Sequence, residues 1–427
     1  MKIAIVGSGI SGLAVAHALD RQADITLFEA GSYFGGHTHT VDITLPTPKG
    51  PITHGVDTGF LVFNERTYPN LIALFAQLGV ATCKSDMSFS VQAPGPRPGQ
   101  MLEWSGSSLN TVFAQRRNLV NPGFLRMLRD LLRFNKLANH LATQGLEAEL
   151  MQPLATFLTQ QRFSDAFRDW YLLPMLGCIW SCPTSQMLQF PVATMIRFCH
   201  NHGLIQVTNR PQWWTVNGGA RQYVDKILGR VPDKHLNTPV QHITRDGTGV
   251  FVTAGGQTGH FDKVVLACHS DQALALLAAP TPQEQATLGA IAYQPNRAVL
   301  HTDTSVLPQN PRAWAAWNYQ RPSAPVANQA EAHVCLHYLL NRLQPLPFEQ
   351  AVLVSLNPVT PIDPSHVYGV FDCAHPVFDL AAIAAQRQVS GLQGQQHTYF
   401  CGAWTGYGFH EDGLKSGLDV AQLLLTA

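Results

Sequence analysis

The sequence predicts an α/β protein with a parallel sheet at its centre. A strand, a glycine turn and a helix follow one another at the N-terminus, and a second short apolar strand precedes a helix near the C-terminus. The length of 427 residues allows roughly two or three domains. Charged residues make up only 13% of the chain against 45% hydrophobic residues, a balance that excludes intrinsic disorder.

The charge balance and the cysteines limit which partners, compartments and metal sites we expect. The 28 basic and 28 acidic residues cancel, so no overall field attracts a polyanion and we expect no nucleic-acid partner. The eight cysteines are scattered, which favours reduced thiols in a cytoplasmic protein. Cys178 and Cys182 lack a second pair at a metal-ligand spacing, so we expect no metal site. No apolar run reaches the roughly 18 residues that a membrane-spanning helix needs.

The N-terminal unit has the form of a dinucleotide-binding turn. Residues 2–6 are typical of a buried strand, and the glycine turn that follows runs into a helix over 13–19. Gly7 would make the turn, Gly9 would let a pyrophosphate approach the backbone, and Gly12 would let the helix pack closely on the strand. The helix N-terminus would then offer its unpaired N–H groups to the phosphates.

A second strand over 25–28 ends in Glu29, 17 residues after the third glycine of the turn. An acidic residue at this distance can accept hydrogen bonds from a ribose diol. The nucleotide contacts predicted so far are Gly7, Gly9, Ser11, Gly12 and Glu29.

A second glycine pair, Gly35 and Gly36, follows this strand and precedes His37 and Thr38. At this point the chain resembles the flavin amine oxidase superfamily, whose relatives include the phytoene desaturases and protoporphyrinogen oxidases. In that superfamily the pair usually precedes an Arg and folds over the pyrophosphate. Here His37 stands in the Arg position, so the resemblance implies the loop but not a charged clamp.

Three more segments, 56–70, 213–219 and 402–413, resemble one bacterial branch of the superfamily that is associated with modification of membrane fatty acids, including desaturation of methylated chains. The resemblance implies a Rossmann-like FAD-binding domain of the glutathione-reductase type with an interleaved α+β substrate domain. It implies FAD as cofactor and an oxidoreductase that acts on an apolar or lipid substrate. Amine oxidation by the same fold and a non-catalytic nucleotide-binding accessory protein stay open as alternatives.

The same resemblance divides the chain. The FAD-binding domain is expected at 1–75, 210–280 and 370–427, and the substrate domain at 76–209 and 281–369. A small sheet is expected from strands at 238–243, 249–253 and 261–266, and the last helix is expected over 418–425. Further cofactor contacts implied by the resemblance are Gly35, Gly36, His37, Thr38, Gly59, Val240, Gly402, Gly413 and Leu414. Ala403 replaces an acidic residue that holds the ribityl chain in the wider superfamily.

Three residues near the C-terminus are candidates for the chemistry. Trp404 and Tyr407 stand where amine oxidases of the superfamily frame the substrate with two aromatic rings, and they could equally line an apolar channel. His410 is the favoured acid or base because the ordinary pKa of histidine lies near neutrality. A merely structural hydrogen bond of His410 within its loop is the alternative.

One stretch of the neutral chain is strongly basic. Residues 111–140 contain five Arg and one Lys against the single acid Asp130, a net charge of +5, with Phe and Leu between them at near-helical spacing. Such a helix can lie on an anionic membrane, which would place the protein at the inner face of the cytoplasmic membrane. A solvated basic face on a core helix is the other interpretation, and the sequence leaves both open.

Overall fold

A computed structural model describes residues 1–146, 150–180, 183–206, 210–321 and 334–426. Its central sheet is parallel and contains five strands in the order β10 (Asp233–His235), β2 (Asp24–Phe28), β1 (Lys2–Val6), β14 (Lys263–Leu266) and β20 (Thr398–Phe400). Alternate residues of these strands face opposite sides, so Ile3 and Ile5 enter one core while Ala4 and Val6 enter another.

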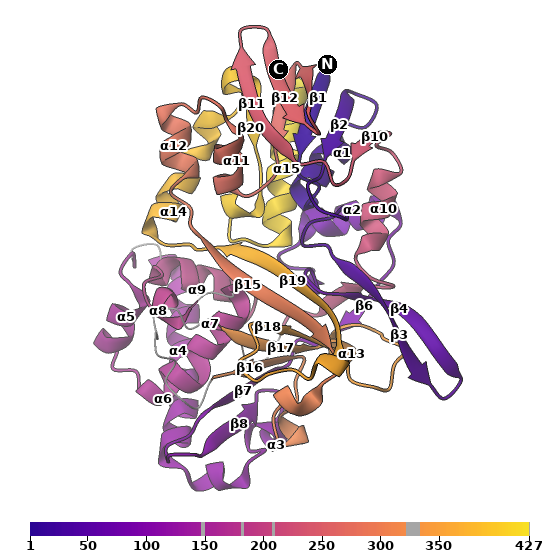
Figure 1. The fold of residues 1–427 in the computed structure, drawn as a ribbon. Coiled ribbons are helices and arrows are strands. Elements are labelled where there is room, and N and C mark those ends of the chain that lie inside the picture. Colours follow the sequence, from indigo (N-terminus) through magenta and orange to yellow (C-terminus); the bar gives the residue numbers. More distant parts are fainter. Residues whose placement is uncertain (147–149, 181–182, 207–209, 322–333, 427) are drawn as a thin grey trace.

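Helices cover one face of this sheet, as the upper part of Figure 1 shows. They are α1 (Ile10–Ala18), α2 (Pro69–Leu78), α10 (Arg221–Leu228) and α15 (His410–Thr426). The other face packs against the antiparallel sheet of β11 (Val240–Asp246), β12 (Gly249–Ala254) and β13 (Gln257–Phe261). Beside this second sheet lie α11 (Ser270–Leu276), α12 (Pro282–Leu288) and α14 (Leu380–Gln386).

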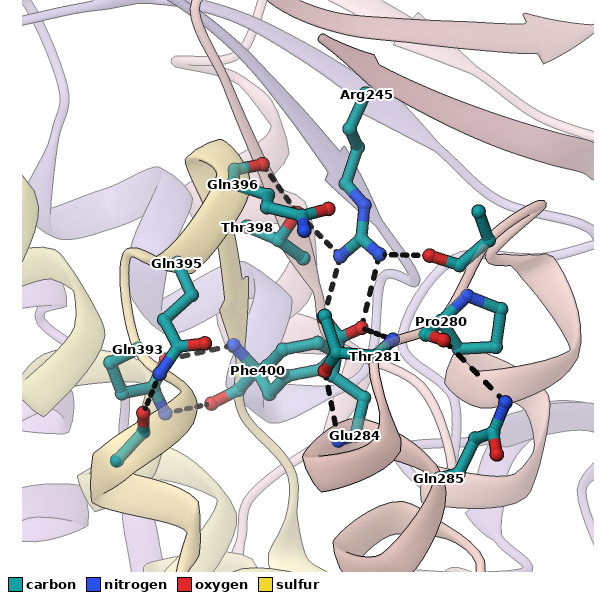
Figure 2. Close-up of polar contacts among 12 residues, drawn as sticks. Arg245, Pro280, Thr281, Glu284, Gln285, Gln393, Gln395, Gln396, Thr398 and Phe400 are labelled. Atoms are coloured by element: carbon teal, nitrogen blue, oxygen red, sulfur yellow. Dashed lines mark hydrogen bonds and ion pairs between the residues drawn. The ribbon is translucent and has the colours of Figure 1, made fainter. Parts of the chain in front are cut away.

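Buried polar contacts fix the corner between β11 and α12. Arg245 and Glu284 form a two-pronged ion pair, and Glu284 also accepts from the backbone N–H of Thr281 (Figure 2). The Gln393 side chain pairs with the backbone of Phe400 in β20 on the neighbouring segment, donating to its carbonyl and accepting from its N–H. These contacts hold together the edge of the lobe that contains the parallel sheet.

A second lobe is built on a seven-stranded sheet, in the order β19 (Val367–Pro376), β15 (Tyr293–His301), β18 (Leu353–Leu356), β17 (Cys335–Leu339), β16 (Trp317–Gln320), β7 (Phe89–Pro94) and β8 (Met101–Ser105). Only β16 and β7 pair in parallel. A group of helices lies beside this sheet at the lower left of Figure 1: α4 (Pro122–Gln144), α5 (Leu154–Gln160), α6 (Asp165–Phe167), α7 (Leu173–Trp180), α8 (Thr184–Met187) and α9 (Val192–Asn201). We call this group the helical lobe.

Smaller elements connect the lobes. A hairpin of β3 (Thr40–Thr47) and β4 (Gly50–Asp57) projects from the molecule, and β9 (Trp213–Val216) pairs with both β5 (Phe63–Asn64) and β6 (Thr82–Ser85). Two short helices, α3 (Leu109–Val112) and α13 (Leu340–Leu343), and a π-helical turn over Arg168–Leu172 complete the regular structure of the described residues outside their 3-10 turns. Among the helices in the described part of the chain, none is both long and apolar enough to cross a bilayer.

The predicted fold class, α/β with a parallel central sheet and an interleaved second lobe, is confirmed, but element pairing moves two domain limits. The expected boundary at 370 falls inside β19, which pairs with β15 along Tyr293–His301 and so belongs to the substrate lobe through Pro376. The expected start of the substrate lobe at 281 is also too early, because Leu288 and Ile291 pack in the core beneath β11–β13. Strand pairing and core contacts, which local sequence does not encode, set these limits.

The last helix begins at His410, so the expected start at 418 was wrong. Gly413 and Gly417, which lie before the expected start, are helical positions that face α1. A Cβ on Gly417 would lie 2.3 Å from the Ser11 carbonyl oxygen, and one on Gly413 would lie 2.8 Å from Ile10 Cγ2. The glycines are therefore explained by the close crossing of α15 and α1.

Candidate functional site

A cavity of about 470 Å³ joins the two lobes. The glycine turn and α1 line one end of it, and side chains from β7, α7, β16 and β17 line the other. Between these ends the walls come from 36–37, 59–62, 374–376 and 408–410. We call the two ends the nucleotide end and the apolar end.

At the nucleotide end the backbone forms an open cradle. Gly9 caps α1 without a side-chain hydrogen bond, and a Cβ built there would meet no atom within 4 Å. A Cβ on Gly36 would instead lie 3.1 Å from the Cα of Gly9, so the second glycine loop rests on the helix N-terminus. Gly7 has a φ of +103°, which L side chains rarely adopt. The N-terminus of α1 offers N–H groups and the positive end of the helix dipole, and the space above Gly9 is open, so this end suits an anionic diphosphate.

Glu29 is held rigidly beside this cradle. Its Oε2 accepts from the backbone N–H of Ser8 at 3.0 Å and from the Ser8 hydroxyl, and its Oε1 accepts from the N–H of Gly31 at 2.7 Å. The carboxylate lines the cavity and has lone pairs left for a ribose diol. Ser8, which the sequence analysis passed over, thus positions the predicted ribose ligand.

In the middle of the cavity His410 is tied to three neighbours. Its ring stacks on Phe60 with centroids 3.9 Å apart, and its Nε2 lies 2.7 Å from the Tyr223 hydroxyl and 3.3 Å from the Thr38 hydroxyl. Burial lowers the pKa of His410 to about 3, with a smaller contribution from His37. The near-neutral pKa that favoured His410 as acid or base is therefore wrong for the folded chain, because burial in the cavity wall disfavours the charged imidazolium.

His375, on β19, is a cavity residue that the sequence analysis missed. The backbone N–H of Arg297 donates to Asn357 Oδ1, Asn357 Nδ2 donates to Asn296 Oδ1, and Asn296 Nδ2 donates to Nδ1 of His375 at 2.9 Å. Because this chain starts at a backbone N–H, its direction is fixed, and the proton of the neutral imidazole lies on Nε2. Burial lowers the pKa of His375 to about 3. His375 is thus a neutral hydrogen-bond donor in the cavity wall.

Charge is almost absent from the cavity wall. Among its described residues Glu29 is the one carboxylate, and no Lys or Arg lines it. Five histidines do, and burial lowers the pKa of each. They are His37, His202, His269, His375 and His410. A lowered pKa favours the neutral imidazole, so these histidines can offer neutral N–H donors to an anionic group.

The apolar end is lined by aliphatic, sulfur and aromatic side chains. They come from strands and helices that are far apart in sequence: Met87, Phe89, Met175, Cys178, Ile179, Phe198, Leu204, Trp213, Trp317 and Tyr338. Cys182, paired with Cys178 in the sequence analysis, lies outside the described residues. No local motif marks this set, because contacts between distant segments bring it together, among them those of α7 with β16, of β17 with β16 and of β7 with β16.

The sequence-predicted residues divide into two groups. Those that line the cavity are Gly7, Gly9, Ser11, Glu29, Gly36, His37, Gly59, Gly402, Trp404 and His410. Those that do not are Gly12, Gly35, Thr38, Val240, Tyr407, Gly413 and Leu414.

The second group supports the site from behind its wall. A Cβ on Gly12 would lie 2.0 Å from the Gly7 carbonyl oxygen, so Gly12 serves helix packing. Val240 and Leu414 are buried in two cores of the nucleotide domain. Of the two rings expected to frame the substrate, Trp404 lines the cavity, whereas Tyr407 does not line it and packs edge-on against Phe198.

Trp404 reaches the cavity wall, but its indole N–H donates to the Cys268 carbonyl at 3.1 Å. The structure also gathers three residues with metal-ligating atoms that sequence spacing did not connect. The ligating atoms of His37, Cys373 and His375 lie within 4.8 Å of one another.

Comparison with known proteins now identifies the family. The family model for flavin-containing amine oxidoreductases matches residues 10–339, more than half of the chain. The chain belongs to this family. The family uses a flavin, and the cradle at Gly9, the fixed Glu29 carboxylate and the Gly36 loop fit the diphosphate and ribose of FAD.

Individual relatives are distant. AofH of Mycobacterium tuberculosis, which bears the name of a flavin-containing monoamine oxidase, is 24% identical over 264 residues, 59% of this chain and 53% of that protein. The chain thus matches about half the length of this curated relative.

Solved structures agree in fold alone. Putrescine oxidase bound to putrescine has a TM-score of 0.69 at 15% identity over 100% of both chains. The fatty acid isomerase of P. acnes has a TM-score of 0.66 at 17% identity over 99% of this chain and 98% of that one.

Proposed function

We propose that this chain is an FAD-dependent oxidoreductase that oxidises or desaturates a fatty acyl chain, methylated or unsaturated and derived from a phospholipid. The observation that carries the proposal is the apolar end of the cavity, where the described wall holds no charged side chain. Burying an acyl chain against such a wall is favourable at about 25 cal/mol per Å². An ammonium group would lose its hydration there without gaining a carboxylate partner.

When bound, FAD supplies the hydride acceptor for such a reaction. A C–H bond beside a double bond or a branch is the reasonable donor, because the neighbouring carbons stabilise the electron deficiency that hydride loss leaves. The chain's own residues bind and orient. Gly9 and the α1 N-terminus would hold the diphosphate and Glu29 the ribose, and His375 in the cavity wall carries its proton on Nε2.

Oxidation of an apolar amine is the second candidate. The family name and the M. tuberculosis relative favour it, and the rings of Phe198, Trp317 and Phe409 in the wall could attract a cation through their faces. Against a diamine substrate stands the position of Glu29, the one described carboxylate of the wall, which is committed to Ser8 and Gly31 at the nucleotide end.

The decisive experiment is anaerobic mixing of the purified flavoprotein with acyl substrates and with amines. We expect the oxidised flavin absorption to bleach with phospholipid-bound unsaturated or methylated acyl chains and not with amines, and mass analysis to find a product lighter by two hydrogens. Bleaching by amines alone would overturn the acyl proposal in favour of amine oxidation. Protein that holds no flavin, or flavin that neither class reduces, would favour an accessory role.

A pair of variants tests the site itself. Ile179→Asp places a carboxylate in the apolar end, so we expect it to lower acyl-dependent reduction at least tenfold while the flavin stays bound. Leu423→Asp, on the exposed side of α15, is the matched control and should leave the reduction rate unchanged. Equal losses in both variants would contradict the assignment of the apolar end as the substrate site.

A further inference from the structure

We propose that the outer face of the helical lobe docks on an anionic lipid bilayer. The face consists of Leu125, Arg126, Arg129, Leu132, Arg133 and Lys136 on α4, together with Arg116, Arg117, Leu119 and Val120 of the 3-10 turn that contacts α4. We call it the α4 face. The proposal concerns where the protein binds and is independent of which substrate it oxidises.

The structure divides α4 into two sides. Its inward side buries Phe124, Met127, Phe134 and Ala138 in the large core of the second lobe. Residues 125, 129, 132 and 136 are spaced i, i+4, i+7 and i+11, so they form one stripe on the opposite side. Along this stripe leucine alternates with a cation, and Leu125 and Leu132 remain 43% and 59% exposed. The helix thus packs one side in the core and exposes apolar side chains to solvent on the other.

The segment before α4 extends this pattern. Val120 is 82% exposed, and Leu119 is exposed as well. Arg116 and Arg117 precede them on the surface. Solitary exposed leucines are ordinary, but four large aliphatic side chains within 119–132 form a concentration that indicates an interaction surface.

The net charge of the α4 face indicates which kind of partner it binds. The single acid of 111–140, Asp130, is buried behind the face and pairs with Arg129 and Arg133 at 3.7 and 3.6 Å. What reaches solvent is therefore positive. Aliphatic side chains mixed with Lys and Arg suit an anionic bilayer, where the aliphatic groups enter the acyl boundary and the cations reach the phosphates. A nucleic acid would use the cations but gain little from exposed Leu and Val.

The α4 face and the apolar end of the cavity share one structural unit. Within the helical lobe α4 contacts α9, and Phe198 of α9 lines the apolar end together with Met175 and Ile179 of α7. Docking through α4 would hold this lobe against the bilayer that contains the proposed substrate (Figure 1).

The test is co-sedimentation of the full-length flavoprotein with vesicles of phosphatidylcholine alone or with added phosphatidylglycerol. We expect binding only to the anionic vesicles, weakened by salt. At about 1 kcal/mol per cation near the surface, Arg126→Gln with Lys136→Gln should weaken binding roughly 30-fold. Leu125→Ser with Leu132→Ser should weaken binding at constant charge.

Matched controls lie elsewhere on the surface. Lys49→Gln with Arg230→Gln removes two exposed cations, and Leu423→Ser with Leu425→Ser removes two exposed leucines, so neither pair should change vesicle binding. Circular dichroism spectra should show all variants folded, since every substituted side chain is at the surface. Absence of vesicle binding, equal binding to neutral vesicles, or equal losses in the control pairs would each overturn the proposal. No turnover is measured, so the result stands apart from the substrate question.

Discussion

The buried ion pair between Arg245 and Glu284 allows its contribution to the free energy of unfolding to be measured directly. It joins β11 to α12 through contacts of 2.5 and 3.0 Å, and the two side chains are only 3% and 2% exposed. Arg245 also donates to the Ala279 carbonyl, and Glu284 accepts from Thr281 (Figure 2). Glu284→Gln would leave a buried guanidinium facing a neutral amide.

We expect this substitution to lower the free energy of unfolding by about 3–5 kcal/mol, the usual cost of removing one partner from a buried pair. Arg245→Leu combined with Glu284→Leu should cost less than the sum of the two single changes, because no buried charge then remains unpaired. The pKa of Glu284 is lowered by the pair, so this stability is present above the ordinary pKa of glutamate and is lost as pH falls through the lowered value.

Urea denaturation at pH 7, followed by circular dichroism, measures these differences. Asp42→Asn is the control, since the Asp42–Arg221 pair is 47% and 37% exposed and should contribute less than about 1 kcal/mol. A Glu284→Gln variant within 1 kcal/mol of wild type, or single changes that simply add, would refute the reasoning.

Three other outcomes are expected. Gly417→Ala places a Cβ 2.3 Å from a backbone oxygen of α1 and should destabilise the fold by about 3 kcal/mol in urea denaturation, whereas Gly247→Ala, with nothing within 4 Å, should be nearly neutral. Burial raises the pKa of Asp57 from 3.8 to about 6, so the stability that protonated Asp57 contributes is complete below pH 3.8 and is lost as pH rises through 6. In urea denaturation between pH 4 and 7, wild type should therefore lose up to about 3 kcal/mol of unfolding free energy that the Asp57→Asn variant does not lose. Asn296→Asp should move the His375 proton to Nδ1 and raise its pKa, which histidine NMR titration would detect; an unchanged titration would contradict the tautomer assignment.

Local sequence was sufficient for the nucleotide end of the site. Gly7, Gly9 and Glu29 act within one strand–helix–strand unit, so their spacing alone predicts where they lie. The same reasoning failed at the last helix, because Gly413 and Gly417 respond to a contact with α1 some 400 residues away in the chain. It also gave no sign of the contact between Tyr407 and Phe198, because Phe198 belongs to another lobe.

The sequence by itself determined the fold class, the family and the cofactor, since each depends on short motifs whose geometry is local. Tertiary structure alone decided the apolar end of the cavity, the neutral state of His375 and His410, and which side of α4 reaches solvent. The physical reason is that burial, pKa and exposure depend on which distant segments exclude water from a side chain. The spacing of residues along the chain does not show which distant segments become neighbours.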